Sequence, residues 1–232
     1  MPEHIKSTSD CESSDWPPDY LTINRATYDA LAEEYRGRIV ADQDRDKLLI
    51  KPFIRLLRER FNESSIRVID VGCGGGLNLA MFAENGFDVT GLDFSKRMLD
   101  VAHDSCPSAN LIHGNVLDYP LLQKSFEGVF AKAIIHLFTL QDARLFLSRI
   151  HGILVPGGIF YVTTTIENEI GAGLKIKMDY AGKVARYRRS WPEHELLKTI
   201  GLMGFKVLET SCNIESSRGK TWFNVWAEKI GV

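Results

Sequence analysis

The stretch from Ile66 to Gly76, IRVIDVGCGGG, constrains the fold of this chain more than any other part of it. Its first part is mostly apolar, which is typical of a strand covered on both faces of a sheet. Four glycines then follow within five positions, and such a loop lets a ligand lie directly against the main chain at the start of a helix. Apolar residues at helical spacing over residues 77–83 predict that helix.

The pattern after this loop alternates between strand-like and helix-like segments. Such alternation predicts an α/β fold with a doubly wound, Rossmann-like and mostly parallel sheet. The segments GFKVLETSC and TWFNVWAEKI predict an antiparallel hairpin that completes a seven-stranded sheet. The expected helices span about residues 77–85, 95–104 and 141–153, and the expected strands span 86–93, 109–114, 126–134 and 159–165, the last after a turn at Pro156, Gly157 and Gly158.

The part before the loop predicts two helices and a leader. Residues 1–19 are polar and rich in Ser, Asp and Pro, so we expect a mobile leader followed by a single domain over residues 20–232. Helices are predicted from Thr22 to Arg36 and from Asp42 to Phe61. Pro52 is expected to kink the second helix or to mark a restart.

The last third of the chain predicts less regular structure. The stretch from Ile166 to Arg189 shows no clean strand period, and we expect it to form a lid or wall over the strand ends. Ser190 and Glu193 have the spacing of a capping box that would open the next helix.

Composition bounds the function classes. The chain has 232 residues and a formal net charge of -2, which provides no general attraction to nucleic acid or to an anionic membrane. Its four cysteines are scattered without CxxC pairs or Cys/His clusters, so we expect reduced thiols and no metal site. No apolar run is long enough to span a bilayer, and the first residues lack the apolar core of a signal peptide. We expect a cytoplasmic protein.

Three kinds of nucleotide-like ligand compete for the glycine loop. A phosphate-binding P-loop requires a lysine after the glycines, and none is present. A dinucleotide fingerprint has a third glycine where this chain has Leu77, which disfavours NAD. The third possibility rests on Asp70, just before the loop, and on Asp93, at the end of the second strand, where a carboxylate can accept from two ribose hydroxyls.

On these residues the chain resembles the class I S-adenosylmethionine-dependent methyltransferases. The resemblance extends from Tyr28 to Lys229, and the glycine motif, the second-strand acid and the PGG turn occur in the family's order. It implies S-adenosyl-L-methionine as cofactor, S-adenosyl-L-homocysteine as product and N-terminal helices that cap the cofactor cleft. The segments that carry it are YDALAEEY, VIDVGCGGG, VTGLDFSKRML, HGNVLDYPL, FEGVFAKAIIHLF, ILVPGGIFYVTT and GKTWFNVWAEK.

The resemblance assigns cofactor roles around the loop. Asp70 would order the loop and the amino group of the cofactor. Gly72 and Gly74 would let the amino-acid part and the ribose approach the main chain. Asp93 would bind the ribose hydroxyls, and Phe94 would stack on the adenine.

Four further positions follow from the same resemblance. Asn115 stands where the family commonly has Asp, and its carbonyl oxygen would accept from the adenine amino group. The Val116 amide would face the adenine ring. Tyr28 and Tyr35 resemble N-terminal tyrosines that close over the methionine end, although packing of an amphipathic helix explains them equally well.

The chemistry of methyl transfer needs alignment and, for some acceptors, a base. His136, at the end of the fourth strand, is our candidate base, and a histidine that only shapes the pocket by hydrogen bonding is the alternative. The candidate substrate-binding residues lie in the run KVARYRRSWP and are Arg186, Tyr187, Arg188, Arg189 and Trp191, because cations with interleaved aromatics can hold a carboxylate or phosphate. The alternative for that run is a solvated helix face.

The sequence therefore predicts a methyltransferase that acts on an O or N atom of a small molecule, without a membrane or nucleic-acid partner. Two alternatives stay open. One is a tRNA or other RNA methyltransferase, and the other is a non-catalytic subunit that binds S-adenosylmethionine, because binding and transfer are separable. The oligomeric state and the acceptor are not encoded in any motif of this chain.

Overall fold

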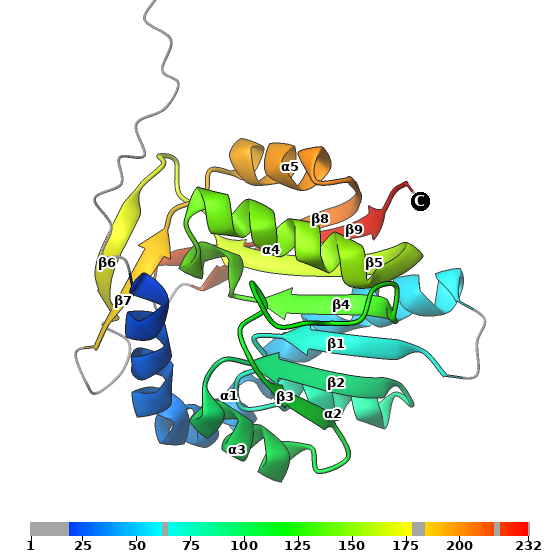
Figure 1. Cartoon of the computed structure of the whole chain (residues 1–232), viewed down its shortest axis with the longest axis horizontal. Helices are drawn as coiled ribbons and strands as arrows, with labels where there is room; N and C mark the ends of the chain where they lie inside the picture. The colour runs from blue at the N-terminus through cyan, green and yellow to red at the C-terminus, as the bar shows by residue number, and fades with distance from the viewer. Residues whose placement is uncertain (1–18, 62–64, 178–183, 216–218, 232) are drawn as a thin grey trace, which may run out of the picture.

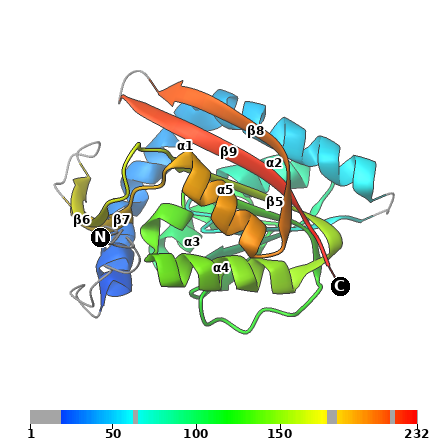
Figure 2. The same cartoon turned by 90° about the horizontal axis from the view of Figure 1, so that it is seen from above.

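A computed structural model describes residues 19–61, 65–177, 184–215 and 219–231, so the predicted leader lies outside the described residues apart from Asp19. A seven-stranded sheet lies between two layers of helices (Figures 1 and 2). The elements follow in this order: α1 (Tyr20–Arg60), β1 (Arg67–Val71), α2 (Leu77–Glu84), β2 (Asp88–Asp93), α3 (Lys96–Ser105), β3 (Asn110–His113), β4 (Phe126–Lys132), η1 (Ile135–Leu137), α4 (Leu140–Ile153), β5 (Leu154–Thr165), β6 (Ala172–Lys177), β7 (Val184–Arg189), α5 (Glu193–Leu202), β8 (Phe205–Glu215) and β9 (Lys220–Lys229).

The sheet has the strand order β3-β2-β1-β4-β5-β9-β8. The pairs from β3 to β5 are all parallel, whereas β9 is antiparallel to both of its neighbours. The strand order reverses between β1 and β4, and the carboxyl ends of these strands face the first part of α1 and the β6–β7 hairpin (Figure 1). Sheets of this kind bind ligands at such a reversal. The predicted mostly parallel, seven-stranded sheet with a closing hairpin is confirmed.

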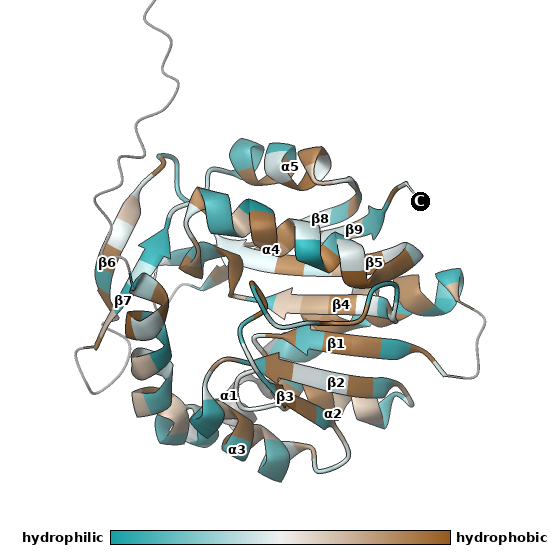
Figure 3. Ribbon diagram, viewed as in Figure 1, coloured by the Kyte–Doolittle hydropathy of each residue, from teal (hydrophilic) through white to brown (hydrophobic). Residues whose placement is uncertain are grey.

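Successive residues of the central strands point to two separate apolar cores. Ile69 of β1 belongs to the core that includes α4 and α5, whereas Val68 belongs to the core that includes α1 and α2. Phe160 and Tyr161 of β5 divide in the same way. Figure 3 shows hydrophobic residues concentrated on the middle strands. This double burial explains why the strand before the glycine loop is an apolar run rather than an alternating one.

Helix α1 is a single helix of 41 residues, where the sequence predicted separate helices over residues 22–36 and 42–61. Pro52 lies inside it without ending it, so the expected restart is wrong. Leu49 and Phe53 beside it are buried in the core against the sheet, and this burial offsets the hydrogen bond that proline removes. The first part of α1 stands at the strand ends, and its last part lies along the sheet (Figures 1 and 2).

Three predicted local features differ from the structure. The stretch from Ile166 to Arg189 contains the antiparallel hairpin of β6 and β7, which forms a wall beside α1 (Figure 1). The predicted capping box is wrong, because the Ser190 hydroxyl donates to Glu167 at 2.5 Å and α5 begins after Pro192 without a side-chain cap. The predicted PGG turn at residues 156–158 lies inside β5, where the pairing with β4 shifts register.

Candidate functional site

The glycine loop crosses from β1 to α2 over the carboxyl end of β2. The Gly72 N–H donates to the Leu92 carbonyl at 2.7 Å, which ties the loop to the neighbouring strand. Gly74 has φ +52° and no heavy atom within 4 Å of the position that a Cβ would occupy. Gly76 has φ +79°, and a Cβ there would lie 2.9 Å from the Ala102 Cα. Gly76 is therefore needed for packing, and Gly74 leaves open space for a ligand.

Asp93 holds the loop from the end of β2. Its two carboxylate oxygens accept the N–H groups of Gly74 at 2.9 Å and of Ser95 at 2.8 Å. Burial raises the pKa of Asp93 to about 6, although both of these hydrogen bonds favour the ionised form. Each oxygen keeps a second lone pair, so the carboxylate can still accept from a ligand.

Asp70 lies beneath the loop and is fully buried. Its Oδ2 accepts from the Asn78 side chain at 3.4 Å, and its Oδ1 has no hydrogen-bond partner in the part of the chain that the structure describes. Burial raises the pKa of Asp70 to about 7, against the opposing effects of Asn78 and the Lys132 cation. An unsatisfied buried carboxyl oxygen is costly, and a donor from a ligand would relieve that cost.

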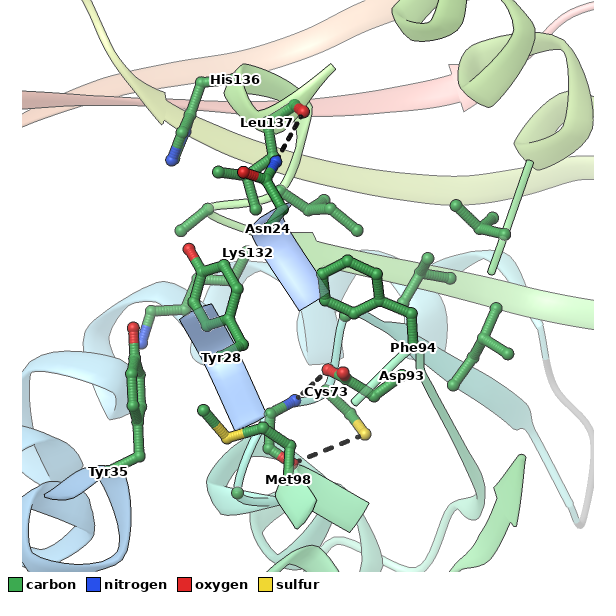
Figure 4. A pocket seen from close by; sticks show the side chains of 18 of the residues that line it. Asn24, Tyr28, Tyr35, Cys73, Asp93, Phe94, Met98, Lys132, His136 and Leu137 are labelled. Carbon is green, nitrogen blue, oxygen red and sulfur yellow. Dashed lines mark hydrogen bonds between the residues drawn. The ribbon is translucent and has the colours of Figure 1, made fainter. Parts of the chain in front are cut away.

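A cavity of about 240 Å³ opens above the loop at the carboxyl ends of the strands. Figure 4 shows that it extends from Asp93 and Phe94 at one end to His136 at the other, with α1 side chains between them. Most of the predicted site residues line it, and these are Tyr28, Tyr35, Gly72, Gly74, Asp93, Phe94, Asn115, Val116, His136, Arg186 and Arg188.

Side chains of α1 close one side of this cavity. The Tyr28 ring lies 6.1 Å from the rings of both Phe94 and Tyr35, measured between centroids. Arg186 of β7 donates to the Tyr28 hydroxyl at 2.8 Å. Both tyrosines line the cavity, and they also pack beside Met98 in a small apolar cluster.

Asn115 and Val116 lie after β3 on the side of Phe94. The Asn115 Oδ1 accepts the Leu117 N–H at 3.1 Å, which fixes this turn. The same oxygen retains one lone pair for a ligand. Val116 is buried and belongs to the core on the α4 side, so it forms a fixed apolar floor.

His136 lies on η1, the short helix that follows β4, and is buried at the far end of the cavity. Its Nδ1 is 3.0 Å from the Thr164 hydroxyl of β5. Its ring centroid lies 6.4 Å from that of Trp222 on β9. The contact with Thr164 fixes the orientation of the imidazole ring, and the side chain lines the cavity.

The cavity also has lining residues that the sequence did not predict. Two of them are the cations Lys132 of β4, on the loop side, and Lys220 of β9, at the far end. Arg188 of β7, from the predicted run of cations and aromatics, lines the far end as well. Lys132 forms an ion pair with Asp46 of α1. A further polar lining residue is Asn24, which donates to the Leu137 carbonyl at 3.2 Å. Lysine and asparagine are common in helices and at strand ends, so only the tertiary fold identifies these positions.

The predicted substrate residues Tyr187, Arg189 and Trp191, together with Asp70, do not line the cavity. Tyr187 is buried against the Tyr20 ring, 4.6 Å between centroids. Trp191 is fully buried in the core on the α4 side, beneath the Arg189 guanidinium. The reason is strand alternation, which turns Arg186 and Arg188 to one face of β7 and Tyr187 to the other. The predicted alternative of a solvated helix face is therefore wrong, because this run forms the strand β7 and its arginines are buried.

The described residues hold no group of three or more side chains that suits a metal ion. Cys73, Cys106 and Cys212 are free thiols, and Cys11 lies outside the described residues. Within the same part of the chain, no helix combines the length and apolar character needed to cross a membrane.

Residues 69–162 match the family model described as a methyltransferase domain. The match covers less than half of the chain. It contains the glycine loop, Asp70, Asp93, Asn115 and His136. The α1 and hairpin residues on the other side of the cavity lie outside the matched range.

Curated relatives share this methyltransferase domain over part of their length. An uncharacterized methyltransferase of Synechocystis is 34% identical over 94 residues, which cover 40% of this chain and 44% of the relative. A ubiquinone biosynthesis O-methyltransferase of Mesorhizobium japonicum is 27% identical over 149 residues, which cover 61% of this chain and 53% of the relative. The chain thus spans about half the length of the curated relatives it matches.

A solved structure matches the whole chain. The 1,6-didemethyltoxoflavin-N1-methyltransferase of Burkholderia thailandensis, with 1,6-didemethyltoxoflavin and S-adenosylhomocysteine bound, superposes with a TM-score of 0.72. The two chains are 20% identical, and the match covers 99% of each. At this identity the likeness establishes the fold. The predicted class I methyltransferase fold is confirmed, including the parts of the chain outside the matched domain.

Proposed function

We propose that the chain is an S-adenosylmethionine-dependent methyltransferase that methylates an O or N atom of a small molecule. One observation carries this proposal: a single cavity connects the glycine loop and Asp93 with His136. The donor and the acceptor of a methyl group must meet in one space that excludes water, and this cavity provides such a space.

The residues at the loop end fit the proposed cofactor. Gly74 leaves room against the main chain, and the Asp93 carboxylate retains lone pairs for the two ribose hydroxyls. The buried Asp70 Oδ1 provides an acceptor beneath the loop for the cofactor ammonium or for a water that it binds. Phe94 would stack on the adenine, and Asn115 would accept from its amino group.

The bound cofactor supplies an activated methyl group on a sulfonium, so the protein has to position and desolvate the acceptor. His136 would accept the acceptor's proton at Nε2, while Thr164 holds the ring through Nδ1. Tyr28 and Tyr35 would cover the methionine end and exclude water. Gly72 and Gly74 would let the cofactor approach the main chain.

The walls of the cavity favour a small acceptor. The cavity is closed on one side by α1 and the β6–β7 hairpin. The Burkholderia neighbour acts on 1,6-didemethyltoxoflavin, and the Mesorhizobium relative is an O-methyltransferase of ubiquinone biosynthesis. These proteins support a small molecule as acceptor and leave O and N equally open. A cytoplasmic location is part of the same proposal.

The direct test is calorimetric binding of S-adenosylmethionine together with a methyl-transfer assay on a metabolite pool and on bulk tRNA. Asp93→Ala should weaken cofactor binding about 100-fold or more, because charge-assisted hydrogen bonds to the ribose contribute about 1.5–3 kcal/mol each. Asp88→Ala is the matched control, since Asp88 is exposed at the opposite end of β2. Circular dichroism checks that both variants fold.

Unchanged affinity in Asp93→Ala would remove the ribose-binding role. Transfer to tRNA alone would replace the small-molecule acceptor by RNA. Tight cofactor binding without transfer to either pool would instead support a non-catalytic subunit.

A further inference from the structure

The end of the cavity away from the glycine loop is rich in cations. Among the described lining residues, the cations are Lys132, Arg186, Arg188 and Lys220, and the carboxylates are Asp46 and Asp93. Asp93 is bound to the glycine loop, and Asp46 pairs with Lys132. Cations therefore outnumber carboxylates among these lining residues.

Two elements bring these cations together. Arg186 and Arg188 lie two residues apart on β7, so both side chains point to the same face of the hairpin. Lys220 begins β9, the strand that pairs with β5. Both arginines are buried, with only 8% of each residue exposed, and buried cations interact strongly with an anion because the surroundings have a low dielectric constant.

Hydrogen bonds fix both guanidinium groups in place. Arg186 donates to the Tyr28 hydroxyl at 2.8 Å, and Arg188 donates to the Thr165 hydroxyl at the end of β5. Arg188 also lies 3.8 Å from a carboxylate oxygen of Glu167, outside the lining. A guanidinium has five donor hydrogens in a planar fork, a geometry that matches a carboxylate or a phosphate. Both guanidinium groups are therefore held in position before any ligand binds.

The carboxylate of the cofactor does not account for all of these cations. Lys132 influences the pKa of Asp70 and is the cation on the loop side. Lys220 is on β9, which lies three strands from β1, a separation of about 14 Å at the usual strand spacing. Arg188 is anchored to β5, two strands from β1. Arg188 and Lys220 therefore lie toward the acceptor rather than the cofactor, and Arg186 lies beside Tyr28 between the two ends.

The same region has an aromatic wall. The Trp222 indole donates to Glu215 at 2.9 Å, which fixes its ring, and the ring lines the cavity beside His136. Leu137 and Phe138 add apolar surface. A fixed indole with neighbouring apolar groups suits a ring-sized apolar body, and the cations suit an anionic group attached to it.

We infer that the acceptor is a small aromatic compound carrying an anionic oxygen group, held by Arg186, Arg188 and Lys220 against Trp222. The inference rests on the proposed methyltransferase function and names its substrate class. A carboxylate and a phosphate share the chemistry that these cations recognise.

The test uses the full chain saturated with S-adenosylhomocysteine and ligand-observed saturation-transfer NMR. Benzoate is compared with benzamide, which has the same ring without the charge, and phenyl phosphate is compared with benzoate. Benzoate or phenyl phosphate should bind at least tenfold more tightly than benzamide. Their order tells a carboxylate site from a phosphate site.

Two variants test whether Arg188 and Lys220 cause the preference for an anionic ring compound over a neutral one. Lys220→Gln and Arg188→Gln should each weaken anion binding about tenfold. Lys206→Gln, an exposed position on β8, is the control. Lys220 begins a strand and is less buried than Arg188, so Lys220→Gln keeps the test valid if Arg188→Gln does not fold.

Equal binding of benzoate and benzamide, no binding of any of the three compounds, or an unchanged preference in folded Lys220→Gln and Arg188→Gln overturns the inference. Calorimetry of S-adenosylhomocysteine separates this outcome from failure of the proposed function. Normal cofactor affinity without anion preference rejects only the substrate class, and absent cofactor affinity rejects the methyltransferase itself.

Discussion

At one end of the cavity the wall is main chain, formed by Gly72, Gly74 and the amides that bind Asp93. At the other end the wall consists of long side chains, with Arg188 and Trp222 as examples. Main chain can approach a ligand closely, but it cannot be changed without changing the fold. Side chains can be exchanged while the fold is kept. The first end therefore suits a constant ligand, and the second suits a ligand that differs among related proteins.

A comparison of two glycines tests the main-chain end and should give the largest effect. Gly76→Ala should lower the free energy of unfolding by about 2–5 kcal/mol, because its φ is positive and the new methyl meets the Ala102 backbone. Gly74→Ala should cost about 1–2 kcal/mol, because only its φ is unfavourable. Urea denaturation measures both values.

Cofactor binding should respond to Gly74 more than stability does. The methyl of Gly74→Ala would enter the open space of the cavity, so the affinity for S-adenosylmethionine should fall at least tenfold. Calorimetry on the folded variant measures this loss. Wild-type affinity would mean that the ligand does not approach the loop at this residue.

His136 tests whether the far end acts in the chemical step. If its Nε2 accepts the acceptor's proton, His136→Ala should lower kcat about 100-fold and leave the affinity for S-adenosylmethionine unchanged. The exposed His103 on α3 provides the control His103→Gln. Wild-type turnover in His136→Ala would exclude the base and leave the hydrogen bond to Thr164 as a structural contact.

Asp70 gives a smaller, pH-dependent effect at the loop end. Its pKa is raised to about 7 by burial, so below that pH the free protein carries a proton there. A cofactor ammonium near Asp70 favours the ionised carboxylate, so affinity should fall by up to about tenfold per pH unit below pH 7. Calorimetry in buffers of different ionisation enthalpy should detect proton release on binding, and Asp70→Asn should reduce it. Identical proton release in that variant would contradict this role.

In the ligand-free protein, folding stability changes with pH in the opposite direction to cofactor affinity. Burial favours the neutral carboxyl of Asp70, so its contribution to stability is present below the ordinary pKa of about 4 and is lost as the pH rises through about 7. Asp70→Asn keeps a neutral side chain and should flatten this decline. Chemical denaturation of the ligand-free protein between pH 4 and pH 8 measures it.

The loop end was predictable because its residues follow consecutive strands of a parallel sheet. Asp70, Asp93 and Asn115 each end or follow a strand, and the parallel order brings such positions to one edge. The other end was not predictable in this way. Lys220 and Trp222 reach the cavity only because β9 pairs with β5, a long-range contact that no local pattern specifies.

The local hydrophobic pattern also gave wrong secondary structure in two segments, β7 and α1, where tertiary burial differs from what the pattern predicts. The β7 run VARYRR contains polar residues on both faces, because Arg189 is buried against Trp191 and Glu195 while Arg186 and Arg188 face the cavity. An alternating apolar signal is therefore absent from a real strand. The uninterrupted α1 is the opposite case, since tertiary burial overrides the proline that local rules treat as a break.

Asn24 has a consequence for the order in which the protein assembles. Its buried side chain donates to the Leu137 carbonyl at 3.2 Å and accepts the Tyr187 N–H at 2.8 Å. Both partners are synthesised more than 100 residues later on the ribosome. The helix that carries Asn24 is thus synthesised before the residues that its side chain contacts. A nascent chain therefore contains its glycine loop long before its cavity can close.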